Sequence, residues 1–119
     1  MLNDTGEREH FENGAMREPA SGKGRFDLIS PYMLERLAKH YENGANKYEE
    51  GNWEKGLSSK RCIDSALRHI NNYMMGKTDE DHLSAAIWNL ACIVHYEEIS
   101  PQFVDIKTRP EFKEGEGDR

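Results

Sequence analysis

The segment from Thr78 to Glu98 constrains the fold most, because it is apolar around most of the circumference that a helix would have. A helix with so broad an apolar surface is buried on more than one side. Thr78 is a suitable N-cap, and three acidic residues follow it in the first turn. The segment therefore predicts a helical bundle that is completed by dimerisation. Its apolar residues recur at helical spacing and are Leu83, Ala85, Ala86, Ile87, Trp88, Leu90, Ala91, Cys92, Ile93 and Val94.

Two further segments have helical periodicity, and no stretch has a convincing strand pattern. Ser30 and Pro31 are typical of an N-cap and a first helical position, and Gly44 is typical of a helix end. A second helix is expected from about Ser59 to Met75, with its core row made of Ile63, Ala66, Leu67, Ile70, Tyr73 and Met74. The predicted fold class is all-α, a small bundle of three main helices.

The chain is 119 residues long and forms one domain at most. Residues 1–21 contain almost no periodic apolar residues and are expected to form a mobile N-terminal arm. Residues 22–99 carry the helical patterns and are expected to form the folded domain. Residues 100–119 are predicted to be a polar C-terminal tail, in which residues 109–119 have a disordered composition.

The charge balance limits the partners and the compartment. A net charge of −6 argues against a nucleic-acid backbone or an anionic membrane as partner. No apolar run approaches the ~20 residues that a membrane helix needs, and the N-terminus has no signal-peptide pattern. Cys62 and Cys92 fall on apolar helix rows, which favours reduced core thiols over a disulfide or a metal pair. We therefore expect a cytoplasmic protein.

The polar segment from Gly44 to Gly56 is a candidate ligand-binding loop. It carries Lys47, Tyr48, Asn52 and Trp53 within a short stretch. A lysine attracts phosphate, an aromatic ring stacks on a base, and an asparagine hydrogen-bonds a base edge. The alternative is that Trp53 closes one end of the bundle.

Acids and imidazoles on the second and third helices form a candidate metal site. Asp64 and His69 lie on the second helix, and Asp81 and His82 lie at the start of the third. A helical hairpin brings these ends into one neighbourhood, where carboxylate oxygens bind Mg²⁺ or Mn²⁺. The alternative is that Asp81 caps its helix and that the histidines make hydrogen bonds at the core edge.

Four cations are candidate phosphate partners. Lys23 and Arg25 lie in a glycine-rich turn, Lys47 lies in the loop, and Arg68 lies beside the core row. The alternative is solvated surface charge. Asn89 shares a helix face with His82, and the small residues between them leave room for a ligand.

Several short motifs support a family resemblance. The chain resembles the phage dATP/dGTP diphosphohydrolases related to MazZ, within the MazG-like group of nucleoside triphosphate pyrophosphohydrolases. The motifs that carry the resemblance occur in order and include Glu12-Asn13-Gly14-Ala15, Gly22-Lys23-Gly24-Arg25-Phe26-Asp27, Tyr41-Glu42-Asn43-Gly44-Ala45, Lys47-Tyr48, Asn52-Trp53, Asp64-Ser65-Ala66-Leu67-Arg68-His69, Asp79-Glu80-Asp81-His82 and Trp88-Asn89.

The resemblance implies a small all-α enzyme that forms homodimers or higher homo-oligomers and uses Mg²⁺ or Mn²⁺. Such enzymes cleave deoxynucleoside triphosphates between the α and β phosphates, which releases a monophosphate and pyrophosphate. If the gene is phage-encoded, the implied location is the host cell cytoplasm. The implied partner is a small deoxynucleotide, with neither nucleic acid nor membrane.

The sequence departs from the group in its acidic patterns. The group's Glu-Glu-x-x-Glu and Glu-x-x-Asp patterns are both absent. Either His69 and His82 replace carboxylate ligands, or the chain is a binding relative that has lost the chemistry.

The site expected on this basis is that of a metal-dependent dATP/dGTP diphosphohydrolase. Asp64 and His69 are predicted to act in catalysis, and Asp64, Asp81 and His82 are predicted to hold the metal. The alternative function is a non-catalytic nucleotide-binding or host-interaction phage accessory protein on the same bundle. The predicted substrate-binding residues are Lys23, Arg25, Lys47, Tyr48, Asn52, Trp53, Arg68 and Asn89.

Overall fold

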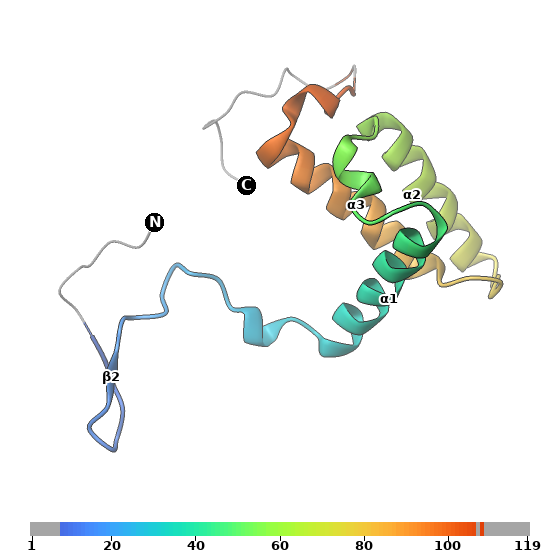
Figure 1. The fold of residues 1–119 in the computed structure, drawn as a ribbon. Helices are drawn as coiled ribbons and strands as arrows, with labels where there is room; N and C mark the ends of the chain where they lie inside the picture. The colour runs from blue at the N-terminus through green and yellow to red at the C-terminus, as the bar shows by residue number, and fades with distance from the viewer. Residues whose placement is uncertain (1–7, 107, 109–119) are drawn as a thin grey trace. The chain divides into compact units, whose positions relative to one another are not determined.

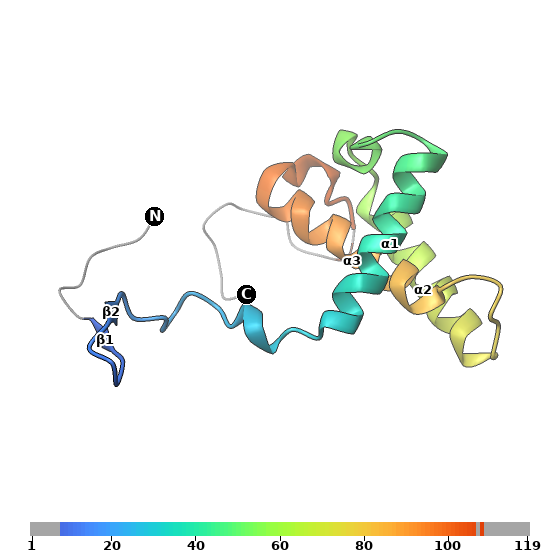
Figure 2. The same ribbon diagram turned by 60° about the horizontal axis from the view of Figure 1, so that its bottom comes forward.

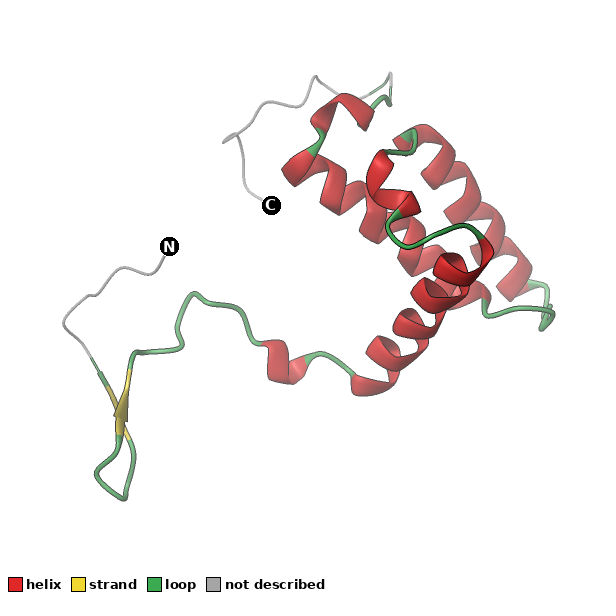
Figure 3. Cartoon of the chain, viewed as in Figure 1, coloured by secondary structure: helices red, strands yellow, loops and turns green. Residues whose placement is uncertain are grey.

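The computed structural model describes residues 8–106 and residue 108, and the chain divides into two compact units after Ser30. Most of the described residues of the second unit are helical (Figures 1 and 3). This confirms the predicted all-α bundle of three main helices. The elements of this unit are the α-helices α1 (Pro31–Lys47), α2 (Ser59–Met74) and α3 (His82–Ile99), and the 3₁₀-helices η2 (Asn52–Lys55) and η3 (Pro101–Phe103).

The first unit contains a short hairpin that the sequence pattern did not predict. Strands β1 (Glu9–His10) and β2 (Met16–Arg17) pair antiparallel, and the turn η1 (Phe26–Leu28) follows. Strands of two residues are too short to show alternation, so no periodicity could reveal them. The mobility expected for residues 1–7 and 109–119 falls outside the described residues.

Helix α3 is the centre of the second unit, since it contacts both α2 and α1. Figures 1 and 2 both show α2 and α3 running side by side. Their contacts run in opposite directions along the chain, with His69 meeting His82 and Ser65 meeting Asn89. The two helices therefore form an antiparallel hairpin. None of the helices in the described part of the chain is long and apolar enough to cross a bilayer.

The core lies between α2 and α3 and is built around Cys62, Cys92, Ile93 and Tyr96. The Tyr96 hydroxyl donates a 2.6 Å hydrogen bond to the Trp53 carbonyl, which ties the polar loop to α3. Both cysteines are free and buried, and burial raises the pKa of Cys92 to about 12. The prediction of reduced core thiols is therefore confirmed.

The apolar rows expected to form the core are largely exposed in the single chain. On α2, Leu67 is 60% exposed and Met74 is 79% exposed. On α3, Leu83, Ile87, Leu90 and Val94 are at least 36% exposed. The hairpin instead buries the neighbouring faces, whose small side chains let the two backbones approach closely. Of the predicted α2 row, Ala66 is buried. The buried residues are Ser59, Cys62, Ala66 and His69 on α2, and His82, Ser84, Ala85, Ala86, Asn89, Cys92, Ile93 and Tyr96 on α3.

The helix ends differ from the expected ones in two places. Helix α1 continues through Gly44 to Lys47, because one glycine costs a helix only about 1 kcal/mol. Helix α3 is capped by Asp81 rather than Thr78, since the Asp81 carboxylate accepts hydrogen bonds from the Ser84 N–H and hydroxyl.

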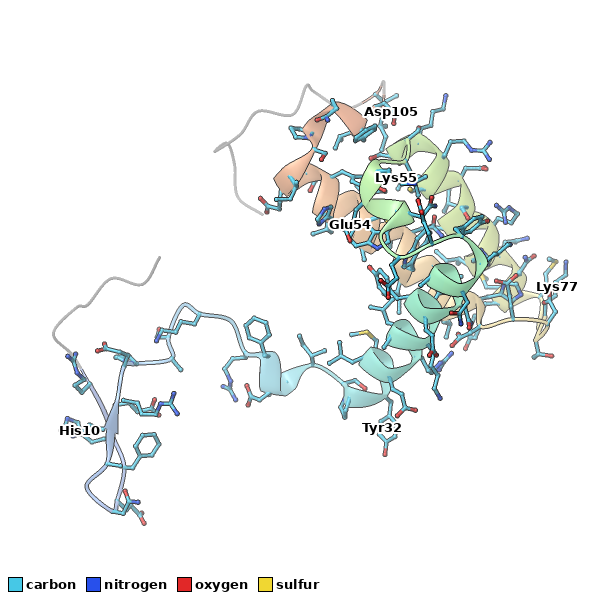
Figure 4. The ribbon with its side chains drawn as sticks, viewed as in Figure 1. His10, Tyr32, Glu54, Lys55, Lys77 and Asp105 are labelled. Atoms are coloured by element: carbon cyan, nitrogen blue, oxygen red, sulfur yellow. The ribbon has the colours of Figure 1, made fainter. Side chains whose placement is uncertain are left out.

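The open end of the α2–α3 hairpin is held by the segment after η3, and the candidate site lies at the opposite end. At one end, the Asp105 carboxylate accepts hydrogen bonds from the Ser58 hydroxyl and from the Lys60 N–H at the start of α2. Lys77 belongs to the turn at the other end, and Figure 4 shows Asp105 and Lys77 at opposite ends of the hairpin. The candidate site lies at the Lys77 end.

Two glycines of the second unit are predicted to respond oppositely to alanine. Gly56 has φ +112°, and a Cβ there would overlap the Phe103 ring, whereas a Cβ on Gly44 meets nothing within 4 Å. We expect Gly56→Ala to lower the free energy of unfolding by about 1–3 kcal/mol. Gly44→Ala should raise it by about 0.5–1 kcal/mol. Urea unfolding followed by circular dichroism measures both, and a stable Gly56→Ala protein would contradict the packing of Phe103 on this loop.

Candidate functional site

His69, Glu80 and His82 form the group of potential metal ligands in the described part of the chain. One donor atom from each residue lies within 4.8 Å of the others. His69 comes from the end of α2, Glu80 from the turn, and His82 from the first position of α3. The hairpin brings them together because its turn is short and both histidines point into the α2–α3 contact.

The hydrogen bonds of the cluster determine where its protons lie. His82 Nε2 lies 2.8 Å from an Asp79 carboxylate oxygen, so this ring nitrogen donates to Asp79. A neutral His82 then has its lone pair on Nδ1, which lies 2.9 Å from His69 Nδ1. His69 must donate that hydrogen bond. The chain of donors therefore runs from His69 through His82 to Asp79.

The pKa shifts of His69 and Asp79 favour a neutral imidazole and an ionised carboxylate. Burial lowers the pKa of His69, with Glu80 acting in the opposite direction, so its ring is neutral near pH 7. The hydrogen bond from His82 lowers the pKa of Asp79. A neutral imidazole that donates its second nitrogen to a carboxylate is the usual form of a histidine metal ligand.

The donor set fits a borderline divalent metal better than Mg²⁺. Two imidazoles and one carboxylate suit Mn²⁺, Zn²⁺ and similar ions, whereas Mg²⁺ prefers oxygen ligands alone. His69, Glu80 and His82 would hold the ion and Asp79 would orient His82.

Asp81, predicted as a metal ligand, lies beside the cluster but has other partners. Arg36 of α1 donates two hydrogen bonds to its carboxylate, at 2.6 and 2.8 Å. Ser84 donates two more from α3. These donors hold the pKa of Asp81 well below its usual range. The carboxylate thus joins α1 to α3, and its predicted role as a ligand stays a prediction.

Asp64, predicted as both ligand and catalytic residue, is exposed on α2. It precedes His69 by five residues, which on an α-helix separates the two side chains by about 140°. Asp64 and His69 therefore do not share a face within one chain. Arg68 is also exposed, and its guanidinium donates to the Ser65 hydroxyl at 3.4 Å. The roles predicted for Asp64 and Arg68 stay predictions.

The polar loop lies near the other end of α3. The Trp53 ring packs edge-on against His95, with ring centroids 4.7 Å apart. Lys47 ends α1 with its ammonium group 5.4 Å from the centre of the exposed Tyr48 ring. Asn52 begins η2, and its N–H donates to the Glu49 carbonyl. No finding tests the substrate-binding roles predicted for these residues.

The remaining predicted substrate ligands have local partners. The buried Asn89 amide donates to the Ala85 carbonyl at 2.8 Å and to the Ser65 hydroxyl at 3.4 Å, so it joins α3 to α2. Lys23 and Arg25 belong to the first unit, where Arg25 forms an ion pair with Asp27. Their predicted roles likewise stay predictions.

Sequence reasoning missed three residues of the site. Glu80 and Asp79 were interpreted only as acids in a first helical turn, and His40 was not singled out. The useful signal was the i, i+3 spacing of Asp79 and His82. This spacing lets the Asp79 carboxylate accept a hydrogen bond from the His82 ring. His40 on α1 is acted on electrostatically by Glu80, His69 and Asp81, although it is distant in sequence.

A small all-α unit with a two-histidine, one-carboxylate cluster defines a class of protein, a helical domain with a candidate divalent-metal centre. The family model described as dATP/dGTP diphosphohydrolase, N-terminal, matches residues 13–106. The chain belongs to this family, which confirms the resemblance and makes it a member of a hydrolase family. Comparisons with curated proteins and with solved structures found no significant match.

Two amide substitutions separate the observed cluster from the ligand predicted by sequence. We expect Glu80→Gln to weaken Mn²⁺ binding at least about 10-fold, because the cluster loses its one carboxylate ligand. Asp64→Asn removes the same charge from an exposed position of α2 and should leave Mn²⁺ binding unchanged. Isothermal titration calorimetry with Mn²⁺ measures both. The opposite pattern would place the metal at Asp64.

Proposed function

We propose that this protein hydrolyses deoxypurine nucleoside triphosphates, dATP and dGTP, to the monophosphate and pyrophosphate in a metal-dependent reaction. The observation that carries the proposal is the His69, Glu80 and His82 cluster. The family name supports the substrate class. A cation bound there would stabilise phosphate charge and lower the pKa of a water molecule.

The residues of the chain have separable tasks in this proposal. Asp79 fixes the His82 ring by accepting the hydrogen bond from Nε2, so that Nδ1 faces the cluster. When His82 donates from Nε2, His69 Nδ1 donates to His82 Nδ1, so a cation held by His82 Nδ1 would replace that hydrogen bond. The bidentate pair between Arg36 and Asp81 fixes α1 against the start of α3, beside the place where phosphates would lie.

A nucleotide-binding protein without hydrolytic activity is the second candidate. It is favoured by the carboxylate count, since Glu80 is the one acid within the cluster and Asp81 is paired with Arg36. In phosphoryl transfer, metal ions neutralise the charge that develops on the phosphate. A site with one carboxylate and two imidazoles has few negative groups to hold such ions. This candidate predicts nucleotide binding without turnover.

The activity assay separates the two candidates. The full chain should convert dATP and dGTP to monophosphate and pyrophosphate, and Mn²⁺ should support the reaction at lower concentration than Mg²⁺ because two ligands are imidazoles. Chromatography of the products and a pyrophosphate assay measure this. Glu80→Gln should lower kcat/KM at least about 10-fold, whereas Lys39→Ala, on the exposed side of α1, serves as the control. Nucleotide binding without turnover under either metal would contradict hydrolysis.

We also propose that two copies of the chain pack through the exposed rows of α2 and α3. The rows are spaced at four, three and four residues, as in the seam of a helical bundle. Both rows are rotated in the same sense from the line of contact, so in an antiparallel hairpin they form one face. An apolar face of this length marks an interface. Its residues are the half-buried Ile63 and the exposed Leu67, Ile70, Met74, Leu83, Ile87, Leu90 and Val94.

Two leucines of similar exposure test the homodimer. Leu90 on the α3 row is 44% exposed, and Leu34 on α1, outside both rows, is 49% exposed. We expect the wild-type chain to sediment as a dimer or higher oligomer at micromolar concentration. Leu90→Glu should shift it to monomer, because a charge would be buried in the interface, whereas Leu34→Glu should not. Monomeric wild-type protein would contradict this proposal.

A further inference from the structure

The second unit contains two tryptophan–histidine pairs of similar chemistry. The Trp88 ring lies 5.3 Å from the His40 ring, and the Trp53 ring lies 4.7 Å from the His95 ring. The Tyr41 ring lies between the tryptophans and presents an edge contact to each, at 6.3 and 5.8 Å. Each pair can therefore serve as the control for the other in an experiment. The two pairs differ in their distance from the cluster of His69, Glu80 and His82.

The pair formed by Trp88 and His40 lies near the cluster. Trp88 follows His82 by six residues on α3, a rise of about 9 Å with a rotation of about 120° around the helix, while His95 follows it by thirteen residues, a rise of about 20 Å. The shorter distance is comparable with the separation between the phosphates and the base of one nucleotide, and the longer one exceeds it. His40 contacts the Trp88 ring and lies near enough to the cluster for Glu80, His69 and Asp81 to act on its pKa.

The two tryptophans also differ in their polar contacts and in their place in the fold. Trp53 is a structural residue, because its carbonyl accepts from Tyr96 and its ring meets the edges of Tyr41 and His95. Trp88 is likewise partly buried against the core, but it lies on α3 itself, six residues from His82. The His40 ring is partly buried, and within the described residues no side-chain hydrogen bond engages it.

We propose that Trp88 is the platform on which the purine of the bound nucleotide stacks, and that His40 hydrogen-bonds the nucleoside between the purine and the cluster. This inference rests on the proposed function and assigns its base-recognition half. It places the base on the α1–α3 side of the hairpin, not at the Tyr48 and Trp53 loop. Stacking on an indole accepts either purine, which fits a site for both adenine and guanine nucleotides.

The chain's two tryptophans allow a direct test by fluorescence. Trp53→Phe leaves Trp88 as the sole indole, and Trp88→Phe leaves Trp53. Each variant is titrated with the α,β-imido analogue of dGTP in the presence of Zn²⁺, and its emission is compared with that of protein and Zn²⁺ alone. We expect the analogue to quench Trp88 in Trp53→Phe and to leave Trp53 in Trp88→Phe almost unchanged.

Inorganic tripolyphosphate is the matched ligand, since it carries the phosphates without a base. It should bind without quenching Trp88. Calorimetry on the wild-type chain establishes separately that the analogue binds. Binding with a silent Trp88, or with a response from Trp53 instead, overturns this inference and leaves the proposed function intact. Absence of any nucleotide binding overturns both.

Affinity gives a second readout. We expect Trp88→Ala to raise the dissociation constant of the analogue about 5- to 150-fold, with little change for tripolyphosphate. His40→Gln should weaken the analogue more than His95→Gln does, because the second pair lies beyond the reach of the nucleotide. Equal effects of the two histidine variants would remove His40 from the site. Circular dichroism checks that each variant keeps its helices.

Discussion

The close contact between α2 and α3 is the constraint on which the rest of the structure depends. Small side chains such as Ala66, Ala85 and Ala86 let the two helices approach, and that approach brings His69 within 2.9 Å of His82. The same contact buries Cys92 and Tyr96, which anchor the loop around Trp53. Core and candidate metal centre are therefore two ends of one interface, because both form only when the hairpin closes.

This arrangement leaves large apolar side chains exposed on the outer face of the hairpin. Small and polar residues fill the buried face together with Ile93 and Tyr96, whereas most of the large apolar side chains of the two rows are exposed. A unit of this size has little core of its own. Association with a second copy would cover the rows without disturbing the α1 side, where Arg36 and Asp81 join α1 to α3. In this proposal, the apolar rows and the candidate site use different sides of the same hairpin.

The site could be predicted in outline but not in its ligand set. The sequence pointed to His69 and His82, because both lie near the ends of two helices joined by a short turn. It overlooked Glu80 and Asp79, since acids before a helix are ordinarily read as caps. Only the local geometry shows that Asp81 is the cap, that Asp79 faces His82, and that Glu80 lies close to both imidazoles.

The sequence by itself determined the three main helices, their approximate bounds and the absence of long strands in the part of the chain that the structure describes, because apolar periodicity and helix caps are local properties. It also supplied the family, through motifs that occur in order along the chain. Tertiary structure decided which helix face is buried and which side chains meet. Many of the residues at the α2–α3 contact are small, because the partner helix decides how closely the two backbones approach. The periodicity within one helix carries no information about that partner.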